Sequence, residues 1–312
     1  MFEFEAPDWR ALHSSAARRK RFGFCPVGYF LYHVSGRDGY GGIAEDWEYK
    51  LYAAKHEVRA AGWISLLWRE ALRRYFTPGW DFRRGRFDRW VRRNFELRFT
   101  DLENQSYLLD PKIVPSVFEL TENIFSIDHF YDLVLTELIN RCNVFMNSGL
   151  AAELMQIPLL DFKQVDDLRC WRLGNINFVN SFDLIWRSGR QLRILDLSQH
   201  SYAQEQQRAA DLYRVCMVRF LGLSPAQVNV NFLDPQSGDQ TVFDTQCGKF
   251  EDLFAALSGE AEMWRSYLLR QADVAERNEW LYARKDNCAV CRFRYLCPAS
   301  GMGTAAVHDG SI

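Results

Sequence analysis

The chain has 312 residues, of which 48% are hydrophobic and 15% aromatic, so it is long enough for one large domain or two ordinary ones with a sizeable core. It contains no run of about 18 uncharged apolar residues, and its first residues lack the basic start and apolar stretch of a signal peptide. We therefore expect a cytoplasmic protein with no membrane partner, in which eight cysteines favour metal binding or structural thiols over disulfides.

The net charge of −2 conceals two segments of opposite charge. Residues 69–98 hold ten arginines against four acids, whereas residues 100–170 hold twelve acids against four basic residues. Because arginine binds phosphates and stacks on aromatic rings, the basic segment indicates nucleic acid. We predict that its densest part contacts DNA: Arg83, Arg84, Arg86, Arg89, Arg92 and Arg93. A solvated helix face is the alternative.

Helices are expected over most of the N-terminal half. Residues 1–22 predict a short helix, and residues 45–76 predict one long helix that ends before Pro78. Residues 82–95 predict a helix with arginines on one face and apolar residues on another. Residues 113–160 are apolar and mostly helical in pattern.

The second half of the chain changes to a mixed pattern. Strand-like runs over 176–186 and 191–197 flank the turn "RSGR", and a helix is expected over 202–222. The run "QVNVNFLD" predicts another strand, followed by a helix over 250–281 with a weak point at Ser258-Gly259. This order of elements indicates a mixed α/β fold.

The most specific signal is the stretch "NCAVCRFRYLC", which spaces Cys288, Cys291 and Cys297 as C-x2-C-x5-C. Cys25, which precedes Pro26, is the expected fourth ligand. Four thiolates hold either a [4Fe–4S] cluster or a zinc ion, and the spacing alone leaves both open. Three unligated cysteines near a tail are the remaining alternative. The other four cysteines are expected to be small core residues: Cys142, Cys170, Cys216 and Cys247.

A single remote cysteine with a C-x2-C-x5-C tail resembles the iron–sulphur staple of RecB-like nucleases in the PD-(D/E)XK superfamily. That group includes the AddB subunit of helicase–nucleases and the CRISPR spacer-acquisition exonucleases. The resemblance implies an α/β PD-(D/E)XK core with an N-terminal helical portion and a [4Fe–4S] cluster on the four cysteines. It divides the chain into an N-terminal segment, a helical insertion, a nuclease-like core and a flexible tail: 1–60, 61–170, 171–298 and 299–312.

The resemblance also implies a Mg²⁺ or Mn²⁺ site of oxygen and nitrogen ligands. Asp183 and Asp196 stand in the places of the two strand acids, and His56 resembles the family's metal-binding histidine. Ser198 stands where the family has its catalytic lysine. Ala209 stands where the family has a glutamine four residues before a tyrosine.

Two functional hypotheses follow from this resemblance. The first is a metal-dependent deoxyribonuclease, a hydrolase acting on single strands or DNA ends in antiviral defence, including CRISPR systems, or in DNA repair. Loss of the lysine and the glutamine favours the second, a catalytically dead nuclease-like subunit that binds DNA or serves as a scaffold in a larger protein complex. A zinc-stapled binding protein without nuclease ancestry is a third alternative.

Overall fold

The chain was analysed as a computed structural model that describes residues 12–14, 16–35, 46–77, 84–157, 162–173, 176–197, 203–243, 250–275 and 283–300. It divides into two compact units, which we call the sheet unit and the cysteine unit. The sheet unit comprises Met1–His13, Arg59–Thr100 and Asn123–Ser258. The cysteine unit comprises Ser14–Val58, Asp101–Glu122 and Gly259–Ile312. Helix α10 (Phe250–Ala275) begins in the first unit and ends in the second.

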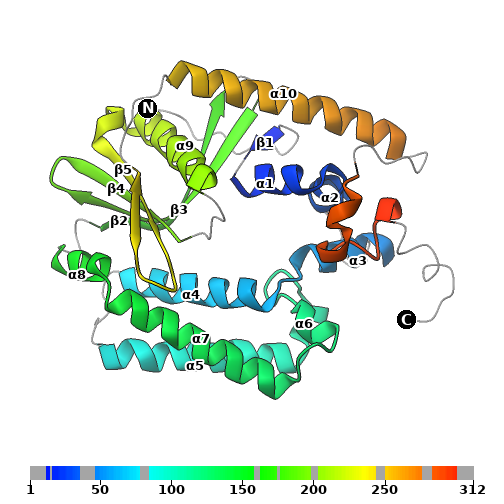
Figure 1. The fold of residues 1–312 in the computed structure, drawn as a ribbon, viewed down its shortest axis with the longest axis horizontal. Coiled ribbons are helices and arrows are strands. Elements are labelled where there is room, and N and C mark those ends of the chain that lie inside the picture. Colours follow the sequence, from blue (N-terminus) through cyan, green and yellow to red (C-terminus); the bar gives the residue numbers. More distant parts are fainter. Residues whose placement is uncertain are drawn as a thin grey trace. The chain divides into compact units, whose positions relative to one another are not determined.

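The sheet unit is built on a mixed sheet, which has six strands among the described residues (Figure 1). The order is β1-β3-β4-β5-β6, and β2 also pairs with β3. The pairs β2–β3, β3–β4 and β5–β6 are antiparallel, whereas β4 and β5 are parallel. The strands are β1 Leu12–Ser14, β2 Phe162–Leu173, β3 Ile176–Ser188, β4 Gln191–Asp196, β5 Val228–Leu233 and β6 Gln240–Phe243.

The parallel pairing of β4 with β5 explains why β5 is buried along its whole length. Parallel neighbours need a crossover connection, which α9 (Ala203–Leu221) supplies between β4 and β5. All six residues of β5 are buried, including two asparagines. Their amides are satisfied, since Asn229 Nδ2 donates to Gln191 Oε1 at 2.8 Å and Asn231 Nδ2 donates to the Ile194 carbonyl at 3.0 Å.

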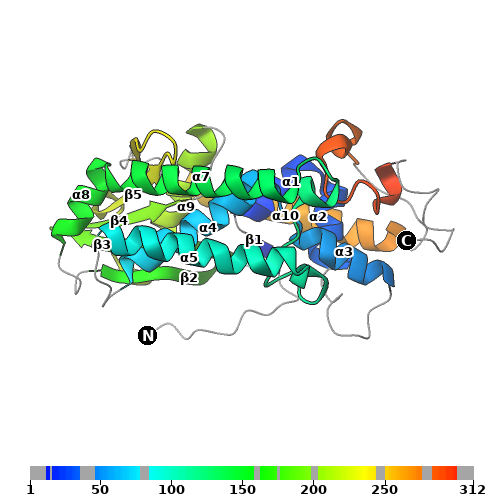
Figure 2. The same cartoon turned by 90° about the horizontal axis from the view of Figure 1, so that it is seen from below.

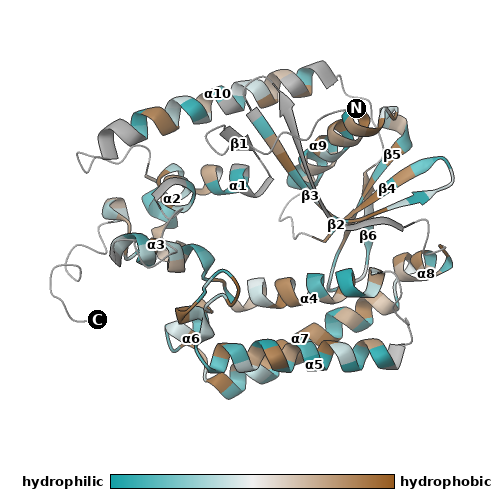
Figure 3. Ribbon diagram, turned by 180° about the vertical axis from the view of Figure 1, so that it is seen from behind, coloured by the Kyte–Doolittle hydropathy of each residue, from teal (hydrophilic) through white to brown (hydrophobic). Residues whose placement is uncertain are grey.

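Helices complete the sheet unit. In Figure 1, α4 (Ala60–Phe76) lies between the sheet and the pair α5 (Arg84–Glu103) and α7 (Ile127–Met146), which run side by side in Figure 2 as well. A short helix, α8 (Gly149–Gln156), follows α7. The mixture of brown and teal along α4 in Figure 3 reflects its amphipathic sequence. Its buried residues recur at helical spacing: Ala60, Trp63, Ile64, Leu67, Trp68, Ala71, Leu72, Tyr75 and Phe76.

The cysteine unit consists of short helices and turns. Its N-terminal part contains α1 (Ala16–Phe24), α2 (Pro26–Phe30), a π-helical turn at Leu31–Ser35 and α3 (Asp46–His56). Further pieces are 3₁₀ turns at Ser106–Leu108, Lys285–Val290 and Pro298–Ser300, and α6 (Phe118–Thr121). One apolar core joins the two ends of the chain and contains Cys25, Val27, Leu31, Leu51 and Phe293.

The expected mixed α/β class and most of the expected elements are confirmed. The strands at 176–186, 191–197 and 227–234 are β3, β4 and β5, and the helices at 82–95 and 202–222 are α5 and α9. Helix α10 passes through Ser258-Gly259 without a break. No helix within the described ranges is long and apolar enough to cross a membrane.

Two expectations about elements were wrong, and a strand was missed. The predicted helix over 45–76 is two helices, because Val58 leaves the helical path and forms a parallel bridge with Val117. The Val58 N–H donates to the Ser116 carbonyl at 2.9 Å, and the Phe118 N–H donates to the Val58 carbonyl at 2.8 Å. Strand β2 was not predicted. Of the helix expected over 1–22, residues 1–11 lie outside the described residues, Leu12–Ser14 is strand β1, and Ala16–Phe24 is α1.

Candidate functional site

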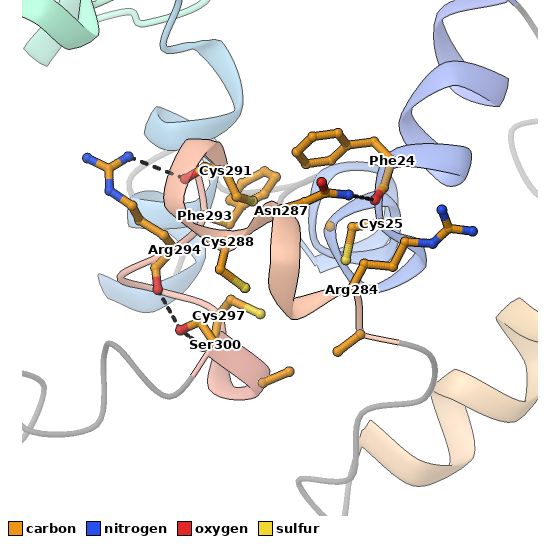
Figure 4. Close-up of a pocket in the computed structure, with 13 residues that line it drawn as sticks. Phe24, Cys25, Arg284, Asn287, Cys288, Cys291, Phe293, Arg294, Cys297 and Ser300 are labelled. Carbon is orange, nitrogen blue, oxygen red and sulfur yellow. Dashed lines mark hydrogen bonds between the residues drawn. The ribbon is translucent and has the colours of Figure 1, made fainter.

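The four cysteines singled out in the sequence line one pocket of the cysteine unit (Figure 4). In that view Cys25 lies on one side of the pocket, and Cys288, Cys291 and Cys297 lie on the other. All four are free thiols. The fold therefore brings a single residue near the start of the chain to the C-x2-C-x5-C segment near its end.

Local structure explains how the two ends meet. Cys25 has an extended backbone and interrupts the helical path between α1 and α2, with Pro26 at the first position of α2. The Asn287 side-chain amide donates to the Phe24 carbonyl at 2.6 Å and so ties the C-terminal segment to the residue before Cys25. Phe293, which is 2% exposed, inserts into the core between them.

The thiol chemistry of this pocket suits a soft metal centre. Burial raises the pKa of Cys291, and it raises the pKa of Cys297 to about 11. A metal binds thiolates, so loading this pocket would release protons. A set of four thiols fits either a [4Fe–4S] cluster or zinc. As folded, no group of three His, Cys, Asp or Glu side chains among the described residues is placed to hold a metal ion, so a cluster or zinc in this pocket stays a prediction.

A second cluster forms in the sheet unit, around Asp183 within β3 and Asp196 at the end of β4. Leu184 pairs with Leu195, so the antiparallel register makes Asp183 and Asp196 the next neighbours across the two strands. Both carboxylates are 1% exposed. The convergence of two acids, which the sequence predicted for this hairpin, is therefore present.

Asp183 is held by two arginines that the sequence analysis missed. Arg69 donates to Asp183 through Nε at 3.1 Å and through Nη2 at 2.9 and 3.0 Å. Arg73 donates to Asp183 Oδ1 through Nε at 3.0 Å and Nη2 at 2.8 Å, and the Leu197 N–H donates to Oδ2 at 2.8 Å. Arg69 and Arg73 are four residues apart and so project from the same face of α4. The four-residue spacing indicates that the two arginines share one helix face, but it does not indicate that this face packs against Asp183.

Asp196 has a different partner. The Tyr213 hydroxyl, on α9, donates to Asp196 Oδ2 at 2.7 Å. Burial, and then the negative charge of Asp196, raises the pKa of Tyr213 well above its ordinary value, so this hydroxyl stays a donor. Ala209, at the position of the family's glutamine, is buried on the same helix. Ser198, at the position of the family's lysine, lies outside the described residues.

His56 ends α3 and belongs to the cysteine unit, whereas the two acids belong to the sheet unit. Its ring packs against Tyr52, with ring centroids 4.7 Å apart. Burial lowers the pKa of His56 to about 4, with contributions from Lys55, Lys112 and Arg292. The imidazole is therefore neutral at neutral pH, as a metal ligand must be.

The predicted DNA-contacting arginines lie on α5. Arg86, Arg89, Arg92 and Arg93 are exposed, while Phe87 and Val91 on the other face are buried. Arg83 and the side chain of Arg84 lie outside the described residues. The helix thus separates charge from apolar residues as the sequence predicts.

Comparison with known proteins adds little to this geometry. No protein-family model matches the chain, and no curated protein matches it. Among solved structures, the chain is similar to the crystal structure of SSO0001, with 13% sequence identity and a TM-score of 0.29. That similarity covers 59% of this chain and 79% of the other.

Proposed function

We propose that this chain is a DNA-binding iron–sulphur protein of the RecB-like nuclease family, with a PD-(D/E)XK core whose cutting activity is weak or absent. The observation that carries the proposal is the pocket shared by Cys25, Cys288, Cys291 and Cys297. One free cysteine near the start of the chain and three near its end match that family's iron–sulphur staple, both in donor type and in chain order. A bound [4Fe–4S] cluster would join these segments covalently and stabilise the unit.

The carboxylate site supports weak or absent cutting. A Mg²⁺ or Mn²⁺ ion at Asp183 would have to displace guanidinium groups that already donate to both carboxylate oxygens. Two cations beside a buried carboxylate also oppose the approach of a third. As folded here, the residues fit a divalent ion poorly, so the Mg²⁺ or Mn²⁺ site stays a prediction and no catalytic step is derived from it.

The alternative function is a nuclease-like subunit that never cuts and serves as a DNA-binding or scaffolding component of a larger complex. The contacts of Arg69 and Arg73 with Asp183 favour this alternative, because the two guanidinium groups would then neutralise the carboxylate in place of a catalytic metal ion. Loss of charge at the lysine position, which is Ser198, points the same way.

The test uses protein purified without oxygen. We expect bound iron and sulphide, binding of labelled single-stranded DNA, and little or no cutting with Mn²⁺. The double variant Arg69→Ala, Arg73→Ala separates the two functions: Mn²⁺ binding with restored cutting would indicate a blocked nuclease, whereas no cutting would indicate a dead one. Protein without iron, or wild-type protein that does not bind DNA, would refute the proposal.

A further inference from the structure

A second site lies on the cysteine unit, where three cations meet one aromatic ring. The guanidinium of Arg21 on α1 lies 3.4 Å from the centre of the Tyr32 ring. The Lys55 ammonium on α3 lies 5.2 Å from it, and the Arg292 guanidinium lies 5.9 Å from it. We call these four residues the Tyr32 cluster. These residues come from three separate segments of the chain, which folding brings together.

The Tyr32 cluster is a concentration of positive charge, to which Arg18 adds beside Arg21. Within the described part of the chain, neither Arg21 nor Arg292 forms an ion pair. Arg21 Nη1 instead lies 3.1 Å from His33 Nε2, and Arg292 Nη1 donates to the Lys55 carbonyl at 2.7 Å. Two acids lie near this region: Glu57, on which Arg292 acts electrostatically, and Asp110, which acts on His56. Arg69 and Arg73, by contrast, both form ion pairs with the buried carboxylate of Asp183.

Like charges held together oppose folding. Cation–π contacts with one tyrosine offset only part of that cost. A cluster of cations is most readily kept in a fold where an anionic ligand binds to it and neutralises part of its charge. All three cations are partly exposed, so a ligand has access to them. Guanidinium and ammonium groups are the usual protein partners of phosphate.

We infer that the Tyr32 cluster binds the phosphate backbone of single-stranded DNA. The inference rests on the proposed function and gives it a contact site separate from the arginines of α5. The Arg21 guanidinium covers the ring of Tyr32, so we assign the cluster to phosphates and not to stacking of a base.

The cluster also depends on the cysteine pocket. Arg21 lies four residues before Cys25, Arg292 follows Cys291 directly, and the ring of Tyr32 lies 6.3 Å from that of Phe293. Docking of the C-terminal segment therefore brings Arg292 to Tyr32. Loss of the staple is expected to remove the contribution of Arg292 to DNA binding.

The test compares Arg21→Gln and Arg292→Gln with the wild type, using the anisotropy of a labelled single-stranded oligonucleotide over a salt series. Each substitution should weaken binding and reduce the slope of log affinity against log salt by about 0.7, the value for one phosphate contact on a single strand. The thermal midpoint without DNA should stay equal or rise, because repulsion is relieved. Arg265→Gln, an exposed arginine of α10 in the same unit, is the matched control and should change neither quantity.

The outcomes separate the two proposals. Wild-type binding with unchanged slopes in both variants would overturn this inference and leave the proposed function standing. Absence of DNA binding in the wild type would overturn both. Because Arg292 is next to Cys291, iron content is measured in each variant, and Arg21→Gln with full iron content decides the matter. Arg21→Lys keeps the charge and should keep the slope. Inorganic phosphate that competes equally well with DNA at equal phosphate concentration would show a free-phosphate site instead, and would also overturn the inference.

Discussion

Asp183 is the residue whose environment departs most from what the sequence predicted. It was predicted to hold a divalent metal, and in the structure it accepts hydrogen bonds from Arg69, Arg73 and the Leu197 backbone. A buried carboxylate so paired contributes little net stability, but removing one partner leaves uncompensated charge behind. The carboxylate is thus held by its surroundings even without metal.

Asp183→Asn should lower the free energy of unfolding by about 3–5 kcal/mol, because two guanidiniums lose their counter-charge. The control is Glu153→Gln, which breaks a half-exposed pair in which Glu153 accepts from Arg193 Nη1 at 2.7 and 2.9 Å. That pair should be worth about 0–1 kcal/mol. Denaturant unfolding of the three proteins measures both values. Equal small losses would mean that Asp183 is not a buried counter-charge.

His33 predicts the response of the cysteine unit to acid. Burial lowers its pKa to about 2, and Arg18, Arg21 and Lys55 add to the shift. Because the unfolded histidine binds its proton near pH 6.5 and the folded one does not, stability is fully present above pH 6.5 and is lost as pH falls below it. His33→Gln should flatten this loss by up to about 1.4 kcal/mol per pH unit. Unfolding midpoints between pH 7 and 5, with the slope unchanged in the variant, would contradict this assignment.

At the scale of elements, α5 is the other surface that we predict to contact DNA. Its exposed arginines stand opposite a buried apolar face, so substituting them should not unfold the helix. The triple variant Arg86→Ala, Arg89→Ala, Arg93→Ala should weaken DNA binding and lower the salt slope by about 2 if each arginine contacts one phosphate of a single strand. Binding equal to that of the wild type would leave α5 as a solvated helix face or a protein-binding one.

The spacing of apolar residues in the sequence correctly predicted several strands and helices. β3, β4, β5 and α9 follow from alternating or helical apolar spacing, and the "RSGR" turn places the two acids together. Features set by distant partners were missed. The break after α3 arises from the pairing of Val58 with Val117. The contact between Arg69 and Asp183 joins residues 114 positions apart, which no local pattern in one sequence reveals.

On the scale of the whole molecule, the cysteine pocket joins the two ends of the chain. Its cysteines span residues 25 to 297, and the apolar core beside it draws on the same segments. If the proposed cluster binds there, we expect it to stabilise the whole unit and not only one loop. The spacing C-x2-C-x5-C singled out three of these cysteines, and Cys25, which precedes Pro26, was the expected fourth; the structure places all four around one pocket.

Cys291→Ser should abolish the brown colour of the protein, lower its iron content and loosen the cysteine unit to proteolysis. The matched control is Cys142→Ser, a buried free thiol on α7 in the sheet unit. It should cost some stability but keep the iron. Equal iron in both variants would show that Cys291 is not a ligand.

The most direct test of the central claim is the iron, sulphide and zinc content of protein purified without oxygen, measured for the wild type and for Cys25→Ser. The account predicts about four irons and four sulphides for each wild-type chain, as a [4Fe–4S] cluster requires, and a marked loss of both in the variant. One zinc without iron or sulphide would contradict it, as would a Cys25→Ser variant that keeps its full cluster.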